Sequence, residues 1–396
     1  MSNIYRHWDL KTLMLYILMG LIGAVCLYFV KKKEKKTGKK QKITSFPYLF
    51  WFFTWVIFAA YRYIDYNIGG TDAIVYVKYF SICLDSYIPS YYQHYDVLYR
   101  VLNILIRFIS NDVHVYLIAF YSILVFSYIL FLNDFSDKNV NIAPYILTFY
   151  LYLRGFNTFR SNLAISLILI GIVLLGRNKK KLSLVVMLST FFIQKAAILY
   201  SLGVYIFVLL FKKGKIKIKH CIVLAFVGFF IGKYAQSFLI NLDKSILNGA
   251  YSAYARKSLI SSFFDNFWKI CFEQLILLVF VVLYNTKIRE NNDLCDEPAK
   301  SIKQLIYIIC LFDFVTIPIT YILSIWRGYE FLYLPRLVMW NEIINIIGCR
   351  FDKFSRKIVA MIFTVVFVAW MSFRIYNTWE ASSLMPYIFE PFMWLK

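Results

Sequence analysis

Long apolar runs separated by short charged connections dominate the pattern of hydrophobic and polar positions along the chain. Many of these runs approach the roughly 20 residues that an α-helix needs to cross a bilayer. Because helices satisfy their own backbone hydrogen bonds within lipid, the pattern predicts an all-α, polytopic transmembrane helical bundle. We expect about twelve spans in a single integral membrane domain, residues 1–396. The expected span centres are Met19, Trp55, Tyr121, Leu147, Ile168, Leu188, Ile206, Phe226, Leu278, Ile309, Ile343 and Thr364.

The segment at 95–110, YDVLYRVLNILIRFIS, has the periodicity of an amphipathic helix in the first outer loop. Its polar residues Asp96, Arg100, Asn103 and Arg107 recur every three or four positions, which places them on one helical face. The segment is short for a full crossing, so we expect it to lie in the membrane interface or to dip into it. Its polar face either points to water or turns toward a cluster of arginines, and the sequence leaves both arrangements open.

Composition and charge predict on which side of the membrane each loop lies. The chain is 60% hydrophobic with a mean hydropathy of +0.61, against roughly 45–50% apolar residues in soluble domains. A formal charge of +22 would suggest nucleic acid for a soluble protein, but here the loops carry the charge, and we expect no nucleic-acid partner. The positive-inside rule predicts cytoplasmic loops near 31–45, 177–181, 212–220, 285–304 and 350–357. Both termini and the loops near 62–112, 239–265 and 325–336 are then outside.

The positive residues differ in kind between the two predicted sides. Cytoplasmic loops use mostly lysine, whereas arginine is concentrated on or near the outer side. Any positive charge serves topology, but a guanidinium offers a planar fork of five donors that can hold phosphate at two points. This asymmetry favours a phosphate or pyrophosphate ligand, and the alternative is that arginine snorkels well at interfaces. The outer arginines are Arg6, Arg62, Arg100, Arg107, Arg154, Arg160, Arg256, Arg327, Arg336 and Arg374.

The stretch 150–171, YLYLRGFNTFRSNLAISLILIG, places Arg154 and Arg160 between two apolar runs. An arginine at membrane depth costs roughly 2.5–3.5 kcal/mol even on the mildest insertion scale, so it is rarely kept without a partner. Either these arginines snorkel to lipid headgroups, or they face a cavity and bind an anion. Asn157 and Arg160 fall near one helical face with small residues beneath the arginine, and this spacing favours the cavity.

Two further outer segments carry candidate ligand contacts. Tyr254 lies among basic residues in the 239–265 loop, where it fits either a sugar platform or an aromatic interface belt; the chain has 32 tyrosines. The turn at 325–336 brings Arg327 and Arg336 to the mouth of the predicted bundle.

Several common catalytic and metal-binding patterns are absent from the sequence. There is no Walker A, GxGxxG, HExxH or GxSxG motif, the four histidines are scattered, and no CxxC pair occurs. We therefore expect no metal site and no other cofactor. The membrane-depth carboxylates of Asp313 and Glu342 are expected to pair with an arginine or a backbone amide rather than to relay protons.

Several segments, in order along most of the chain, together resemble the EpsG-like and Wzy-type polysaccharide polymerases. One of them, FRSNLAISLILIG, also has the arginine, ten residues, glycine spacing of O-antigen polymerases. The sequence departs from the family pattern at Gln194, where a histidine is usual, at Asp96 and Val97 in place of Glu-Pro, and at Trp340 in place of tyrosine. The similar segments are IGGTDAIVYVKYF (68–80), YDVLYRVLNILI (95–106), FRSNLAISLILIG (159–171), IQKAAIL (193–199), RLVMWNEI (336–343) and PYIF (386–389).

The resemblance implies polymerisation of polyprenyl (undecaprenyl) pyrophosphate-linked oligosaccharide repeats at the outer face of the cytoplasmic (inner) membrane. On this interpretation Arg154, Arg160 and Arg336 bind the pyrophosphate, with Arg62 and Arg100 as second choices. The expected substrate-lining residues are Asn157, Gln194, Lys195, Arg327 and Tyr254.

Because Gln194 replaces the family histidine, Asp96 or Asp72 must act as the base if one is used. The resemblance also implies the lipid bilayer and a chain-length regulator protein as partners. The alternatives are a flippase or other transporter of lipid-linked oligosaccharides, a polysaccharide ligase, and another lipid-linked glycosyltransferase.

Overall fold

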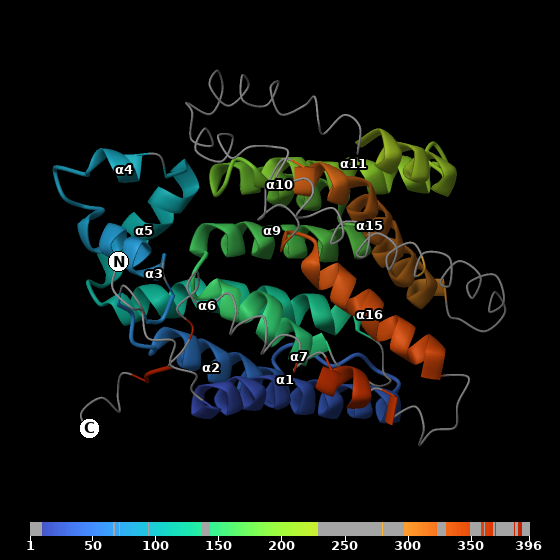
Figure 1. Cartoon of the computed structure of the whole chain (residues 1–396), viewed down its shortest axis with the longest axis horizontal. Helices are drawn as coiled ribbons and strands as arrows, with labels where there is room; N and C mark the ends of the chain where they lie inside the picture. The colour runs from blue at the N-terminus through green and yellow to red at the C-terminus, as the bar shows by residue number, and fades with distance from the viewer. Residues whose placement is uncertain are drawn as a thin grey trace. The chain divides into compact units, whose positions relative to one another are not determined.

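The computed structural model describes residues 10–65, 68–70, 72–93, 95–136, 143–228, 279, 297–322, 330–348, 358–359, 361–366, 369, 384 and 387–389. Within these ranges the chain is mostly helical and contains no strand beyond isolated bridges, which confirms the all-α class for this part of the protein. In chain order (Figure 1) the elements are α1 (Leu10–Thr37), α2 (Phe46–Ala60), α3 (Ala73–Ile82), α4 (Ser90–Gln93), α5 (Val97–Ile109), α6 (Val113–Phe135), α7 (Ala143–Leu147), the π-helix η1 (Thr148–Tyr152), α8 (Leu153–Gly155), α9 (Phe159–Gly176), α10 (Lys180–Ser189), the 3₁₀ turn η2 (Thr190–Phe192), α11 (Ala197–Lys212), α15 (Glu297–Ile322) and α16 (Tyr333–Gly348).

The protein is a membrane protein. Among the described residues, α1, α6 and α9 are long and apolar enough to cross a bilayer, and large apolar side chains such as Leu18 and Val25 of α1 point outward. Every expected span centre within the described ranges falls in a helix; Leu278 lies outside them. The total of about twelve spans stays a prediction. Shorter apolar helices are Phe46–Ala60, Ala73–Ile82, Ala197–Lys212, Ile218–Gly228 and Gln304–Thr316.

The chain divides into two compact units, which we describe separately. Unit 1 comprises 1–173, 192–194 and 340–396, and unit 2 comprises 174–191 and 195–339. The expectation of a single integral membrane domain stays a prediction.

In unit 1, α1 packs against α2 and α7, and α2 packs against α6 (Figure 1). Buried aromatic side chains link these helices through backbone carbonyls. Trp55 Nε1 donates to Met19 O at 3.0 Å, and Tyr152 Oη donates to Trp55 O at 2.6 Å. These bonds satisfy the polar tips of large rings that would otherwise be buried unpaired.

The two ends of the unit 1 helices differ chemically. At the end where α1 finishes, buried Lys31 pairs with Glu34 at 3.0 Å, and Tyr48 donates to Asn133 Oδ1 at 2.9 Å. At the end where α1 begins, the backbone N–H of Tyr387 donates to Thr12 Oγ1 at 2.8 Å. The lysine tract and the C-terminal segment therefore lie at opposite ends of α1.

In unit 2, α10 and α11 form a hairpin, and α11 packs on α15. Thr190 and Ser201 hydroxyls lie 2.8 Å apart across the hairpin, and Phe207 meets Phe312 with ring centroids 5.4 Å apart. The predicted spans at Leu188 and Ile206 run together in the hydropathy pattern, and the structure separates them at residues 193–196.

We predict that Gly23→Leu destabilises the fold by about 1–3 kcal/mol, the usual range for overpacking. A Cβ at this position would lie 2.9 Å from the Trp51 ring and 3.0 Å from Pro144 Cβ, so α1 would have to move away from both. Thermal unfolding of the detergent-solubilised protein measures the effect. Val25→Leu, at an exposed position on the same helix, is the control; equal unfolding temperatures for the two variants would contradict this packing.

Candidate functional site

Two glycines shape the turn that carries the IGGTD segment. Gly69 and Gly70 have φ angles of +79° and +113°, which L side chains rarely adopt. A Cβ on Gly70 would lie 2.3 Å from Phe156 O, and one on Gly69 would lie 2.2 Å from Tyr63 O. Only glycine lets this turn approach the segment before α9 so closely.

Arg62 joins three segments of unit 1. Its Nε donates to Gly69 O at 2.9 Å and its Nη2 to Phe156 O at 3.0 Å, while Nη1 donates to Ala59 O at the end of α2. The guanidinium carbon also lies 4.4 Å from the centroid of the Phe156 ring, a cation–π distance. The side chain is 1% exposed. Arg62 therefore holds the backbone of the site in place, and its expected role as a second-choice pyrophosphate ligand stays a prediction.

Asn157 connects the turn to the start of α9. Its Oδ1 accepts a hydrogen bond from the backbone N–H of Asp72 at 2.5 Å. Asp72 precedes α3 and is partly exposed. The expected substrate-lining residue Asn157 and the candidate base Asp72 are thus neighbours, and the amide fixes the backbone from which this carboxylate projects.

Arg160 occupies the first turn of α9, as the resemblance implied for this arginine. Its Nη1 lies 3.7 Å from Asp96 Oδ2, and its guanidinium lies 4.6 Å from the centroid of the Tyr95 ring. Among the described residues its Nε has no hydrogen-bond partner, and 26% of the side chain is exposed. Both the positive charge and the N-terminus of an 18-residue helix attract an anion here.

The burial of side chains on α5 shows which way its polar face points, toward water or toward the arginines. Asn103 is fully buried, whereas Val101, Leu105 and Phe108 are exposed on the other side of the helix. Asp96 lies beside Arg160 and Asn103 is buried, so the polar stripe does not face water as a whole. Arg100, one turn after Asp96, is exposed. An outward apolar face fits an interfacial helix.

Tyrosines surround the Arg160–Asp96 pair. Tyr76 stacks on Phe159 with centroids 5.0 Å apart, and Tyr95 packs edge-on against Tyr79 at 4.7 Å. Burial raises the pKa of Tyr79 to about 12 and raises the pKa of Tyr99 well above its ordinary value. At neutral pH both phenols keep their protons, so a carboxylate is the better candidate for accepting one.

Arg154 is the middle residue of the short helix α8, which directly follows the π-helix η1. Short π segments inside α-helices occur frequently at functional sites. The Arg154 carbonyl accepts from the backbone N–H groups of Asn157 and Thr158 at 3.0 and 3.1 Å. The segment that carries Arg154 thus leads directly into the one that carries Asn157 and Arg160.

Arg336 belongs to unit 2 and forms a buried ion pair. Its Nη2 donates to Asp313 Oδ1 at 2.7 Å and its Nε donates to the other carboxylate oxygen. The expectation that Asp313 pairs with an arginine is confirmed. Both donors on this edge of the fork face Asp313, and Arg336 is buried, so the pair has a structural role. The expected pyrophosphate contact of Arg336 stays a prediction.

The structure does not place the remaining predicted site residues beside the Arg160–Asp96 pair. Gln194 is buried in unit 1, and its Oε1 has no hydrogen-bond partner among the described residues. Lys195 belongs to unit 2 and is partly exposed. Arg327 and Tyr254 lie outside the described residues, and the side chain of Glu342 is likewise not described. No group of three or more His, Cys, Asp or Glu side chains suited to a metal occurs in the described part of the chain.

The structure thus brings together Asp72, Asp96, Asn157 and Arg160, which we call the outer site. Tyr95 was missed by sequence reasoning, although its place immediately before the polar stripe of α5 was a usable signal.

A comparison with protein-family models matches the EpsG family over residues 45–389, which is most of the chain. The chain belongs to the EpsG family. Searches of curated proteins and of solved structures gave no match. The EpsG match runs from the start of α2 to Phe389 and includes the whole outer site. Membership in this family agrees with a membrane glycosyltransferase-like polymerase.

We predict that Arg62→Met destabilises the protein by about 3 kcal/mol or more, because three buried carbonyls lose their donor at about 1–3 kcal/mol each. Thermal or denaturant unfolding in detergent measures the change. The matched control is Arg107→Met, since Arg107 is only half-buried and donates to Asn111 O at 2.9 Å; it should cost less than about 1 kcal/mol. Similar losses for both variants would contradict a special role for Arg62.

We predict that Arg336→Met alone destabilises the protein by about 3–5 kcal/mol, because it leaves the Asp313 charge buried and unpaired. Adding Asp313→Leu should restore most of the lost stability, since replacing both charges by apolar groups is often neutral. The same double variant also tests the expected pyrophosphate contact, because binding of a polyprenyl pyrophosphate that survives in it cannot depend on Arg336. Loss of that binding in a stably folded double variant would instead make Arg336 a ligand contact.

Proposed function

We propose that this EpsG-family protein is an oligosaccharide repeat-unit polymerase. It transfers a glycan from a polyprenyl (undecaprenyl) pyrophosphate carrier to a lipid-linked acceptor repeat at the outer face of the cytoplasmic membrane, with both termini outside. The product is a surface polysaccharide of the O-antigen, capsule or exopolysaccharide kind. A chain-length regulator is the expected protein partner.

The observation that carries this proposal is the placement of Arg160. It stands in the first turn of α9, is partly exposed, and its Nη1 lies 3.7 Å from the Asp96 carboxylate. At that distance the two charges attract without forming a short hydrogen bond. A pyrophosphate oxygen arriving at the guanidinium can take the place of the carboxylate and find a helix N-terminus behind it.

The proposed reaction is an inverting displacement. A sugar hydroxyl of the acceptor attacks the anomeric carbon, a new C–O bond forms, and the bond from that carbon to the pyrophosphate oxygen breaks. The hydroxyl proton passes to the carboxylate of Asp96 or Asp72, and the polyprenyl pyrophosphate leaves. Arg160, assisted by Arg154 and Arg100, stabilises the negative charge that grows on the leaving group. The guanidinium groups thus stabilise this charge without a metal ion.

Asp96 suits the role of base because the arriving pyrophosphate frees it from Arg160. Its carboxylate starts beside the leaving-group site and lies at the N-terminus of α5. A general base in such a position contributes typically 10²–10⁴-fold to rate. Asp72 is the second candidate, because its backbone N–H is hydrogen-bonded to Asn157, which lies just before the start of α9.

The test is the length of surface polysaccharide in a strain that lacks this gene, complemented with variants. Wild type should restore long chains. Arg160→Ala and Arg160→Lys should both leave single repeats without long chains, since lysine keeps the charge but loses the two-point fork. Arg107→Ala, a variant of another outer arginine on α5, is the matched control and should behave as wild type.

The alternatives predict other outcomes. A flippase would deplete single repeats at the outer face as well, and a ligase would leave long chains that are not attached to their final acceptor. Normal chain length with Arg160→Lys, at wild-type protein level, would overturn the assignment of this arginine.

A further inference from the structure

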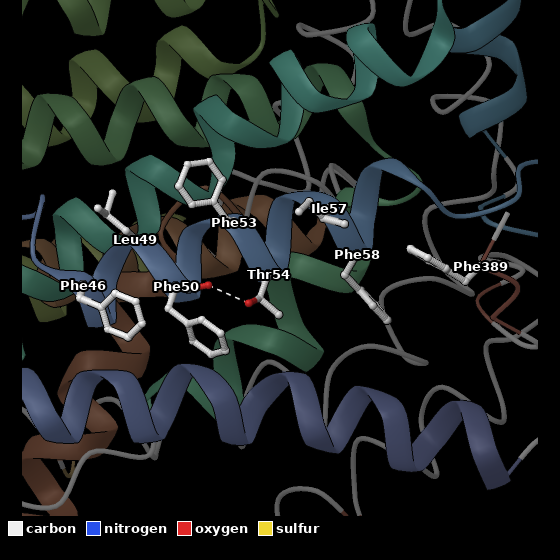
Figure 2. A pocket seen from close by; sticks show the side chains of 8 residues that line it. All are labelled: Phe46, Leu49, Phe50, Phe53, Thr54, Ile57, Phe58 and Phe389. Carbon is white, nitrogen blue, oxygen red and sulfur yellow. Dashed lines mark hydrogen bonds between the residues drawn. The ribbon is translucent and has the colours of Figure 1, made fainter. Parts of the chain in front are cut away.

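An apolar groove runs along α2 in unit 1. It has a volume of about 660 Å³ and is lined by side chains from successive turns of the helix together with one ring from the C-terminal segment (Figure 2). Thr54 is the one lining residue with a polar side chain, and its hydroxyl donates to Phe50 O at 2.7 Å, so its donor is already satisfied. The lining residues are Phe46, Leu49, Phe50, Phe53, Thr54, Ile57, Phe58 and Phe389.

One end of this α2 groove is built into the support of the outer site. Phe389 pairs with Arg62 in an antiparallel bridge, and Phe58 stacks on Tyr387 with centroids 4.2 Å apart. Arg62 in turn donates to the carbonyl of Phe156, the residue before Asn157. The end of the groove at Phe58 and Phe389 is therefore linked to the outer site through Arg62, and the groove extends from that end along α2.

We propose that the α2 groove holds the isoprenoid chain of the lipid carrier while its pyrophosphate lies at Arg160. This inference rests on the proposed function, because it assigns a place to the apolar part of the same substrate. A carrier bound by its pyrophosphate must direct a single long chain from the outer site into the bilayer. The groove offers one apolar path of that kind, starting at Phe58 and ending at Phe46.

The dimensions and chemistry of the groove fit a prenyl chain. The 15-residue helix α2 is about 22 Å long at 1.5 Å per residue, which accommodates several isoprene units end to end. The exposed rings of Phe46, Phe50 and Phe53 present ridges between which methyl branches can pack. Lipid tails are as apolar as the groove, so contact area alone gives little preference in a membrane. Selectivity then depends on shape and on the pyrophosphate, which keeps the chain at high effective concentration.

The experiment compares two carriers in the full-length protein reconstituted into phosphatidylcholine nanodiscs. The probes are undecaprenyl pyrophosphate, whose chain is long enough to reach Phe46 and Phe50, and farnesyl pyrophosphate, whose short chain occupies only the end near Phe58. The distal variant is Phe46→Ala combined with Phe50→Ala. The control is Phe126→Ala, which removes an exposed phenylalanine from α6. Unfolding temperatures equal to wild type establish that each variant is folded.

Wild type should bind undecaprenyl pyrophosphate more tightly than farnesyl pyrophosphate. The distal variant should bind undecaprenyl pyrophosphate about threefold to tenfold more weakly and farnesyl pyrophosphate as before, while Phe126→Ala changes neither. Arg160→Ala should weaken both. Unchanged affinity of the distal variant for undecaprenyl pyrophosphate would overturn the groove and leave the proposed function standing. If wild type bound neither probe, the proposed function would fail and the groove assignment with it.

Discussion

The three hydrogen bonds of the Arg62 guanidinium are the interaction on which the outer site depends. They connect the end of α2, the Gly69 turn and the segment before α9. Two of these segments lead into the site: Asp72 follows the turn, and Asn157 and Arg160 follow Phe156. A buried guanidinium is costly, and here backbone carbonyls and aromatic faces compensate for the lost water. One side chain thereby fixes the relative positions of segments that are distant in sequence.

Lysine and arginine are found at opposite ends of the unit 1 helices. Lys31 and Lys40 pair with Glu34 and Asp134 at one end, where the lysine tract follows α1. Arg62 and Arg160 lie at the opposite end, with the C-terminal segment. Lysine is a compact charge that suits topology, whereas the arginine fork suits directed contacts to carbonyls, carboxylates and phosphate. The proposed orientation, with the arginine end outside, uses both properties.

Much of the site could be predicted from the sequence because its signals are local. The three-and-four spacing of Asp96, Arg100 and Asn103 predicted α5, and the arginine at 160 was correctly expected near a helix start. What could not be predicted are the contacts between distant segments. Asp313 was expected to meet an arginine and Arg336 to meet a pyrophosphate, but their pairing across 23 positions appears only in three dimensions. The burial of Arg62 likewise depends on the carbonyls of Gly69 and Phe156, which no local pattern reveals.

The arginines of the predicted ligand set differ in how completely protein groups satisfy them, and this difference separates structure from chemistry. Arg62 faces three carbonyls, and Arg336 faces a carboxylate along one edge of its fork. Arg160 hydrogen-bonds with Tyr76 and has the Asp96 carboxylate at 3.7 Å, but its buried Nε has no partner among the described residues and part of its side chain is exposed. A guanidinium that the fold already satisfies gains little from an arriving anion, because binding would first break existing bonds. One that is incompletely satisfied gains the full charge-assisted contact. Of these three arginines, Arg160 is the one at which an anionic leaving group would be stabilised most.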